Sequence, residues 1–385
     1  MSETAPHIVV EVSSAPLTIG ADWRALTGRA ATNVFMDPLA INVVHAKNFA
    51  STCVLIAWDK TTDVAKLVGV WALRRTKASP AGPSILAAPP YDYSFLSNPV
   101  VDPAVMDEVV QAFFAAIADD PALPKVIRLR YLDGSSASYP AILKAVSGRG
   151  GHRLILDQRE RAFAAGDASV KRSGATRKKL RQDWNRLSAE GSVAVVNDRS
   201  PTAVREAFEA FLALEAASWK SDRGTAILSN DKTADFARTL IGDLANAGGA
   251  SVALLTLDGK PIAAQVLLYS GAMAYTWKTA FDPRHGKYSP GALLVDKVTE
   301  ALFAGGDIEA IESCSPDGGF MAQMWSGRRS TVDLLVDLGK HKSFAFTVVS
   351  LEARGYAELK AARDRLRLWW SSWRKRRRLA TAGTP

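Results

Sequence analysis

Cysteine is scarce in this chain. Of 385 residues only Cys53 and Cys314 are cysteines, and their separation fits no metal-ligand spacing. This scarcity favours a reduced, cytoplasmic setting. No stretch near the N-terminus joins a basic start to a long apolar run, so no signal peptide is expected. No apolar segment approaches the roughly 20 residues that span a bilayer. The sequence therefore predicts a cytoplasmic protein, either soluble or peripheral at the inner face of the membrane.

Several catalytic signatures are also missing. The chain has no Gly-x-x-x-x-Gly-Lys-Ser/Thr, no His-Glu-x-x-His, no Cys-x-x-Cys and no Gly-x-Ser-x-Gly. These motifs build the sites of P-loop nucleotide hydrolases, zinc proteins and serine hydrolases. Nucleotide hydrolysis, zinc catalysis and serine hydrolysis are therefore disfavoured, and no metal site is expected.

The positive charge that the chain does have is unevenly placed. The net charge is +9, yet residues 171–186 alone carry a net +6 and residues 354–378 a net +8. The remainder is therefore net negative, and the basic character belongs to two helical segments. A nucleic-acid-binding surface over the whole protein is not indicated.

The most informative stretch is a run of three strands, a loop and a helix in the second half. The loop, Asp282–Gly291, places Ser289 as a helix N-cap and Pro290 at the first helical position. Backbone N–H groups and the helix dipole at such a point attract phosphate. The stretch therefore predicts a site for a phosphorylated cofactor. Its strands are expected at Ser251–Leu257, Pro261–Ser270 and Met273–Phe281, with the helix running to about Ala304.

Both halves of the chain contain a strand, an acidic turn and a second strand with helices around them, which suggests a duplicated α/β unit. Only the second copy has the glycine-containing loop; the equivalent stretch of the first, Tyr91–Pro103, has prolines and no glycine. One active cleft is therefore expected. Proline-rich loops are predicted over 79–103. Other strands are predicted at 52–58, 67–74, 125–132, 153–156, 192–196, 308–313 and 331–337, and other helices at 105–117, 202–219, 235–245 and 351–378.

Several groups of residues resemble the GNAT acyltransferase superfamily. They are Leu257–Ala264, Tyr275 with Phe281–Pro283, Tyr288–Leu294, and Glu215 with Ser218–Lys220. Within that superfamily the chain most resembles the tandem branch called CelD/BcsL-like or BioF2-like acetyltransferase domains, which is related to the Fem peptidyltransferases. The resemblance covers roughly residues 22–338.

This resemblance implies an α/β fold of two tandem GNAT-like domains, with mixed β-sheets flanked by helices, a charged connector helix and a long C-terminal helix. An N-terminal degenerate GNAT-like domain is expected at 1–165 and a basic connector helix at 166–190. A C-terminal GNAT-like, acyl-CoA-binding domain is expected at 191–345, followed by a basic, Trp-rich helix and tail at 346–385.

The resemblance also implies an activity: transfer of an acetyl or other acyl group from acyl-CoA to an amine or hydroxyl. The acyl acceptor would be a small molecule, a glycan or a peptide, related to the cell envelope or to an exopolysaccharide. Two alternatives remain. One is a Fem-like peptidyltransferase that uses aminoacyl-tRNA, and the other is a membrane-peripheral accessory protein that keeps the fold without catalysis.

Two departures from the family pattern bear on these alternatives. The usual pyrophosphate cradle, Gln/Arg-x-x-Gly-x-Gly/Ala, has Pro290 here where its first glycine belongs, although the tandem branch commonly uses this Pro-Gly form. The branch also carries an aromatic-Lys pair shortly before a Trp. Phe320, Met321 and Trp325 are present here, but the lysine is missing.

Three residues are candidates for the chemistry. A thioester is already activated, so the site must hold it, accept a proton and stabilise an oxyanion, without a covalent nucleophile. Asp282 would be a general base if partial burial raised its pKa, although Asp-Pro is also a common loop start. Glu312, at the end of the next strand, is a second candidate base or else a solvated carboxylate. Tyr288 is a candidate general acid for the leaving thiolate, or it packs over the helix start.

The cofactor phosphates are expected at the loop and at the helix start. Gly291 and Ala292 are small enough for the backbone to approach a pyrophosphate. His285 and Lys287 either contact phosphate or are merely solvated. The complete set of predicted cofactor-binding residues is His285, Lys287, Ser289, Pro290, Gly291 and Ala292.

The acyl acceptor is expected near the helix that ends in Trp219 and along the third strand. Glu215 and Trp219 share one helix face, although a Trp at a helix end is often a core residue. Tyr275, Trp277 and Lys278 lie on the strand. Strict alternation places Lys278 on the face opposite the two aromatic side chains, where it either meets a phosphate or an acidic substrate or is simply exposed.

The two basic segments each have more than one interpretation. Residues 171–186 are most simply a solvated connector helix, and the alternative is a grip on tRNA or an anionic glycan. The tail combines Trp369, Trp370 and Trp373 with an Arg cluster, which suits an anionic membrane surface. Docking on the protein body competes, because Leu359, Ala362, Leu366, Trp369 and Trp373 share a helix face. Nucleic acid is a third option for the tail.

Overall fold

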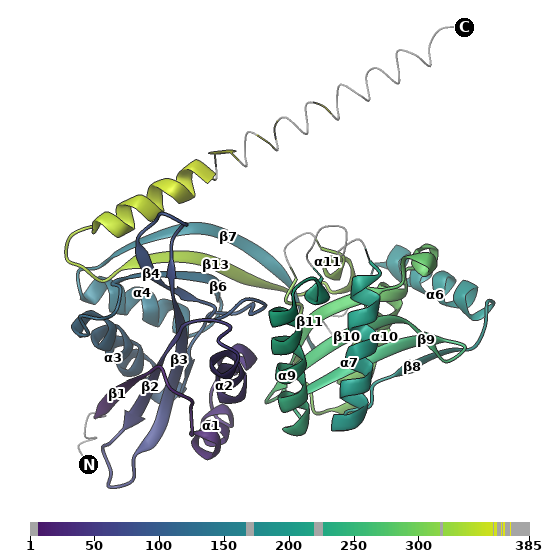
Figure 1. The fold of residues 1–385 in the computed structure, drawn as a ribbon, viewed down its shortest axis with the longest axis horizontal. Helices are drawn as coiled ribbons and strands as arrows, with labels where there is room; N and C mark the ends of the chain where they lie inside the picture. The colour runs from purple at the N-terminus through teal and green to yellow at the C-terminus, as the bar shows by residue number, and fades with distance from the viewer. Residues whose placement is uncertain are drawn as a thin grey trace, which may run out of the picture.

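The computed structural model describes residues 7–166, 173–218, 226–315 and 319–356, together with Glu358, Leu359, Arg363, Arg365 and Trp370. Within these residues the strands join into one long mixed sheet flanked by helices (Figure 1). The hydrogen-bonded order is β1-β2-β3-β4-β6-β13-β7-β12-β11-β10-β9-β8, and β5 pairs with β3. The expected α/β class with mixed sheets is therefore confirmed.

The first half supplies β1 Ile8–Ser13, β2 Thr52–Asp59, β3 Lys66–Lys77, β4 Ser84–Ala88, β5 Val100–Val101, β6 Val126–Asp133 and β7 His152–Ala165. The second half supplies β8 Val193–Val196, β9 Ala250–Leu257, β10 Lys260–Ser270, β11 Met273–Phe281, β12 Ala310–Glu312 and β13 Arg328–Asp337. The three strands predicted before the glycine-containing loop are present as β9, β10 and β11. The stretch 79–103, predicted to be loops, contains β4 and β5.

The α-helices are α1 Gly20–Thr27, α2 Pro38–Ala46, α3 Met106–Asp119, α4 Ser138–Gly148, α6 Gly174–Ser188, α7 Pro201–Ala216, α9 Asp231–Asn246, α10 Pro290–Gly305 and α11 Met321–Met324. A further helix covers 344–356. The 3-10 helices are η1 Val34–Met36, η2 Pro103–Val105, η3 Ile227–Ser229 and η4 Pro283–Tyr288.

Helix α7 shows how the sequence dictates these elements. Pro201 occupies its first turn, where a missing N–H costs nothing. Its apolar side chains recur on one face, and that face is buried in the structure. The apolar residues buried on this face are Val204, Phe208, Phe211, Leu212 and Leu214.

The internal duplication appears as two parallel strand pairs. In the first half β4 runs parallel to β6, and in the second half β11 runs parallel to β12. The other strand pairs described are antiparallel. In each parallel pair a helix, α3 or α10, makes the crossover that parallel strands require. The two halves therefore repeat one architecture.

The two halves lie side by side and share β7 (Figure 1). Residues His152–Ala162 of β7 pair with β13, and Phe163–Ala165 pair with β12. The strand predicted at 331–337 is present as β13, and it inserts between β6 and β7 of the first half. The domain limits 1–165, 166–190, 191–345 and 346–385 remain our proposal.

The hydrophobic core also crosses between the halves. One cluster of buried side chains includes residues of α1, α2 and α3 together with residues of α7 and α9. The rings of Phe49 and Phe236 stack with centroids 3.9 Å apart, and Tyr91 meets Phe236 edge-on. A second cluster lies on the other face of the C-terminal strands, beneath α10 and α6. The halves are therefore packed against one another as well as joined by hydrogen bonds.

The helix 344–356 lies across the N-terminal half (Figure 1). Phe346 and Val349 pack against Ile85, Val126 and Leu335 of the sheet. Trp370 is 51% exposed. Of the predicted face that would dock or bind a membrane, Ala362, Leu366, Trp369 and Trp373 lie outside the described residues. In the part of the chain that is described, no helix combines the length and hydropathy needed to cross a bilayer.

Candidate functional site

A pocket of about 690 Å³ opens where β11, β12, η4 and α10 meet. This volume falls within the range typical of small-molecule sites. Its walls include Lys278 and Phe281 from β11, Ser289 and Gly291 at the start of α10, and Cys314 after β12. The loop predicted to bind a phosphorylated cofactor is therefore beside a real cavity.

The pocket exists because the parallel strands β11 and β12 diverge. β11 and β12 pair only from Met273/Ala310 to Tyr275/Glu312. Directly beyond, the Thr276 hydroxyl donates to the carbonyl of Ser313 at 2.7 Å, and Thr276 and Ser313 both line the pocket. A side-chain hydrogen bond thus replaces the backbone ladder at the point of separation. The gap between the diverging strands forms the pocket floor.

A β-bulge in this region overturns one prediction. Val266 pairs with Lys278 and Leu267 with Thr276, so Trp277 is the extra residue. Such a bulge breaks the strict alternation of side chains. Lys278 therefore does not lie opposite the aromatic residues: its Nζ is 4.9 Å from the ring centroid of Tyr93, whose carbonyl accepts a hydrogen bond from Trp277 Nε1 at 2.8 Å.

Lys278 is held by the predicted acceptor-site residue Glu215. Glu215 is completely buried on α7, and its Oε1 is 3.0 Å from Lys278 Nζ. Its Oε2 accepts the backbone N–H of Ile227 at 2.8 Å. The structure therefore brings Glu215, Trp277 and Lys278 together beside the pocket, and Trp277 and Lys278 line it. Trp219 lies outside the described residues.

Tyr275 points away from this pocket and into the contact between the halves. It is completely buried, its hydroxyl donates to the carbonyl of Thr32 at 2.9 Å, and its ring meets Phe35 edge-on. Burial raises the pKa of its hydroxyl. These contacts give Tyr275 a packing position, and nothing in its geometry supports contact with a substrate.

The start of α10 is built differently from the expected N-cap. Ser289 adopts a left-handed conformation, with φ 52°, and its side chain makes no capping bond. Its carbonyl instead accepts the N–H groups of Ala292 and Leu293, and its hydroxyl accepts from Lys179 Nζ at 3.1 Å. The six residues before it, Pro283–Tyr288, form η4. The turn thus presents the first helical residues, including Gly291 and Ala292, to the pocket.

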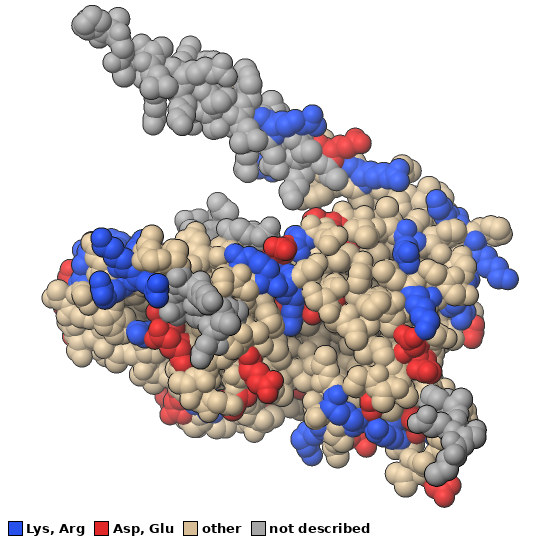
Figure 2. All heavy atoms as spheres, turned by 180° about the vertical axis from the view of Figure 1, so that it is seen from behind, with Lys and Arg blue, Asp and Glu red and all other residues tan. Residues whose placement is uncertain are grey.

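Helix α6 is more than a solvated connector. Leu180 and Leu187 are buried in the core beneath α10, and Thr176, Lys179, Leu180 and Asp183 line the pocket. Its remaining basic residues stay outside: Figure 2 shows a dense group of Lys and Arg at the end of the molecule where Figure 1 places α6. Lys179, paired with Asp183, thus places a cation at the helix start that was predicted to meet phosphate.

Several polar residues of the predicted loop do not line the pocket. Tyr288 is buried, and its hydroxyl donates to Glu190, two residues after the end of α6. Lys287 Nζ lies 3.8 Å from Glu190 and 4.7 Å from the Tyr288 ring centroid. The residues that line the pocket do not include Tyr288, Lys287, His285 or Pro290. Tyr288 as general acid, and His285 and Lys287 as phosphate ligands, stay predictions without geometric support.

Asp282 caps η4 rather than facing the pocket. Its carboxylate accepts the backbone N–H of Arg284 at 2.9 Å and the Nη2 of Arg284 at 2.6 Å. These interactions, first of all the guanidinium, lower the pKa of the carboxyl. A general base here would need a raised pKa, so the geometry favours the turn interpretation that the sequence left open.

This arrangement predicts a titration result. In the Arg284→Gln variant the pKa of the Asp282 carboxyl should rise towards the ordinary value of about 3.9, because the largest cause of its depression is removed. The stabilisation from this pair is present above the unfolded pKa and disappears as pH falls through the lowered folded pKa. Carboxyl-carbon NMR against pH measures the shift. An unchanged pKa in Arg284→Gln would contradict this account.

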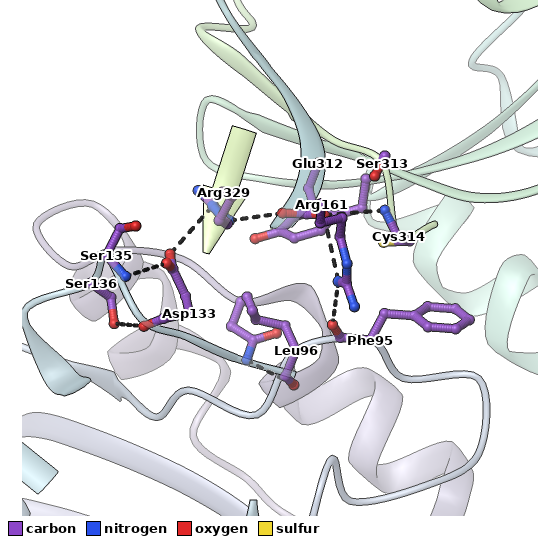
Figure 3. A network of polar contacts seen from close by, with 12 residues as sticks. Phe95, Leu96, Asp133, Ser135, Ser136, Arg161, Glu312, Ser313, Cys314 and Arg329 are labelled. Carbon is purple, nitrogen blue, oxygen red and sulfur yellow. Dashed lines mark hydrogen bonds and ion pairs between the residues drawn. The ribbon is translucent and has the colours of Figure 1, made fainter. Parts of the chain in front are cut away.

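Glu312, one residue before the pocket-lining Ser313, lies in a buried ionic network, which Figure 3 shows. It is completely buried. Its Oε1 lies 3.5 Å from Arg161 Nη1 and accepts the N–H of Cys314 at 3.2 Å, while Oε2 accepts from Arg329 Nη1 at 3.1 Å. Arg329 Nε also lies 3.3 Å from Asp133. Both carboxylate oxygens are engaged, so Glu312 is neither a solvated carboxylate nor placed as a proton acceptor.

Some pocket residues were not predicted from sequence. Cys314 is 6% exposed, has a left-handed backbone with φ 47°, and lines the pocket. Burial, followed by the charge of Glu312, raises the pKa of its thiol well above the usual value, which keeps it protonated. The available signal was its position directly after the strand predicted at 308–313. For Lys179 the sequence held no comparable signal, because a charged helix is usually solvated.

No group of three or more His, Cys, Asp or Glu side chains is arranged to hold a metal ion within the described ranges.

Trp325 is the tryptophan before which the family's lysine is missing. It is 1% exposed, and its Nε1 donates a hydrogen bond to Thr299. Phe320 and Met321, which precede it, line the pocket. The short helix α11 therefore closes one side of the cavity with apolar side chains.

Comparison with known proteins agrees with this geometry. Residues 174–317 match the model of the acetyltransferase (GNAT) domain family. FemX is similar in structure, with a TM-score of 0.58 and 10% identity, over 85% of this chain and 96% of that chain. No curated protein sequence matches the chain.

Two further solved structures are similar. The C-terminal domain (DUF2156) of a putative lysylphosphatidylglycerol synthetase from Agrobacterium fabrum has a TM-score of 0.51 and 15% identity, over 86% of this chain and 95% of that chain. L-PGS from Bacillus licheniformis has a TM-score of 0.51 and 14% identity, over 89% of this chain and 98% of that chain. At such identities the likeness shows the fold alone.

Proposed function

From a GNAT acetyltransferase domain at residues 174–317, we propose that this chain is an acyltransferase that takes an acyl group from acyl-CoA. The acyl acceptor would be an amine or a hydroxyl. The observation that carries the proposal is the pocket of about 690 Å³ between the diverging strands β11 and β12, with the start of α10 at its wall. Membership of the narrower CelD/BcsL-like tandem branch is part of the proposal.

The residues present fit the parts of an acyl-CoA. Lys179 and the first turn of α10 would hold the phosphates, since a helix N-terminus and a nearby ammonium both favour anions. Gly291 leaves its side of the pocket open: a Cβ there would stand 3.5 Å from Phe281 and 3.8 Å from Thr279. Met321 and Met324 supply an apolar wall for the uncharged part of the donor.

Acyl-CoA supplies an activated carbonyl. In the transfer a bond forms between the acceptor nitrogen or oxygen and the carbonyl carbon, the carbon–sulfur bond breaks, and the proton of the nucleophile leaves while the thiolate gains one. The chain's own part is to hold donor and acceptor at close range and to exclude water. Asp282, Glu312 and Tyr288 remain predictions for proton transfer, and their contacts favour structural roles.

Substitution at Gly291 tests the proposal. In Gly291→Trp the indole should fill the pocket beside Phe281 and abolish binding of acetyl-CoA, measured by calorimetry. Gly291→Ala is the matched control: its methyl group would meet only ordinary contacts, and alanine favours a helix. Acetyl-CoA binding should therefore persist in Gly291→Ala. No binding to the wild-type chain, or equal binding to Gly291→Trp, would overturn the donor site.

The aminoacyl-tRNA alternative has one observation in its favour, since the basic helix α6 borders the same pocket. If charged tRNA binds and acetyl-CoA does not, and if neutralising Arg177, Lys178 and Arg181 removes that binding, the donor is an aminoacyl-tRNA. If neither donor binds and the chain floats with anionic liposomes, the non-catalytic accessory role replaces both.

A further inference from the structure

A second, smaller pocket of about 280 Å³ lies in the N-terminal half, against β3, β4 and β6. Four of its wall residues are basic: Arg74, Lys77, Arg128 and Arg130. The acidic residue in its wall, Asp92, is 72% exposed at its side chain and pairs with Arg74. The pocket is therefore strongly cationic, although the described body outside the basic segments is net acidic.

The sheet register explains how the cations converge. Arg74 pairs across the sheet with Ala87, and Ala87 pairs with Arg128. The small side chain of Ala87 thus lies between two arginines on one sheet face. Adjacent strands are about 4.8 Å apart, so both guanidinium groups reach over the same hollow. Arg130, two residues beyond Arg128, extends the row on the same face.

These arginines lack some of the partners that buried donors require. The Nε atoms of Arg74 and Arg128 are buried, and within the described residues neither has a hydrogen-bond partner. Burial, followed by the like charge of Arg130, lowers the pKa of Arg128. Nearby Asp333 is already engaged by Arg159 and by the N–H of Tyr131, and Glu352 accepts from Ser79. Unsatisfied buried donors are costly, and an anion in this pocket would supply acceptors to these arginines.

The position of this pocket connects it to the acyl-donor pocket. Tyr93 is one of its walls. The Tyr93 carbonyl accepts from Trp277 and its ring lies beneath Lys278, and both of those residues line the donor pocket. Tyr93 also has a left-handed backbone, with φ 70°, a conformation disfavoured outside glycine. One ordered residue therefore stands between the two cavities.

We propose that this cationic pocket, bounded by Arg74, Lys77, Arg128 and Arg130, binds the phosphate group of a small phosphorylated molecule. Several cations around one hollow match a multiply charged phosphate better than a single carboxylate, and guanidinium groups bind phosphate through paired hydrogen bonds. The identification of this molecule as the acyl acceptor rests on the proposed function: a phosphorylated acceptor bound in the cationic pocket would extend past Tyr93 to the acyl donor. The anion site itself does not depend on it.

Titration with inorganic diphosphate at low ionic strength, by calorimetry, tests the site. The wild-type chain should bind diphosphate, and Arg128→Met and Arg74→Met should each weaken binding by about 10-fold or more. Methionine keeps much of the side-chain volume, so folding should be retained. Arg75→Met is the matched control: it removes the same charge from the next residue of β3, which is exposed and outside the pocket.

The outcomes separate this site from the donor site. Diphosphate binding should persist in Gly291→Trp; its loss there would place the anion in the donor pocket and overturn the inference. Equal weakening by Arg75→Met, or tighter binding of succinate than of diphosphate, would also overturn it. If diphosphate binds as expected while acetyl-CoA does not bind the wild-type chain, the proposed donor fails and the anion site stands.

Discussion

Replacing Glu312 by alanine is expected to lower the free energy of unfolding by about 3–5 kcal/mol. The change leaves the charges of Arg161 and Arg329 at the contact between the halves without the carboxylate that both approach. Arg161 is 3% exposed, so water cannot readily replace that carboxylate. Equilibrium denaturation, followed by tryptophan fluorescence, measures the loss.

The position of Glu312 makes a second effect measurable. Cys314, two residues later, lines the pocket proposed for the acyl donor and donates its N–H to Glu312. Acetyl-CoA binding should therefore weaken together with stability. Glu309→Ala is the control, because Glu309 is an exposed carboxylate beside the same strand, and its loss should change stability by less than about 0.5 kcal/mol. Similar stability of the two variants would show that the network carries no energy.

Breaking the Glu215–Lys278 pair is expected to have the next largest effect, about 3 kcal/mol for either Glu215→Gln or Lys278→Met. Glu215 is completely buried and the side chain of Lys278 is 12% exposed. Each single change leaves one charge where solvent is scarce. Glutamine keeps an oxygen for the N–H of Ile227, so the loss reports mainly on the charge.

A double-mutant cycle isolates the interaction. The variant with both changes should be less destabilised than the sum of the single variants, because neither charge then remains. Glu209→Ala on the same helix is the control: its pair with Arg238 is about half exposed on both sides, and such surface pairs contribute up to about 1 kcal/mol. Additive single effects would mean that the ion pair does not couple α7 to the donor pocket.

Elements with strong local patterns were predictable from the sequence. α7 showed its apolar face, β9 to β11 were separated by turn residues, and Pro290 marked the start of α10. β4 was missed because its five residues lie between prolines. The location of β13 was missed because strand pairing depends on partners far along the chain, and no local pattern states that β13 lies between β6 and β7.

The features of the candidate site also fall into those that the sequence predicts and those that it does not. The pocket could be placed from the strand-loop-helix sequence, and Gly291 and Ala292 line it. The side on which Lys278 lies could not be predicted, because a single-residue bulge reverses the alternation. The burial of Glu312 depends on Arg161 and Arg329, which come from other strands. Helix α6 carried one weak signal: its two leucines, Leu180 and Leu187, are seven positions apart in an otherwise polar and charged helix, and both are buried.

The strand shared by the two halves bears on how such a molecule can be divided. β7 pairs with β13 along most of its length and passes its last residues, Phe163–Ala165, to β12. A fragment that begins after residue 165 would expose the edge of β12 and carry β13 away from both of its neighbours. Open strand edges invite association with other chains. The duplicated unit has thus become interdependent, and a clean cut between its copies no longer exists.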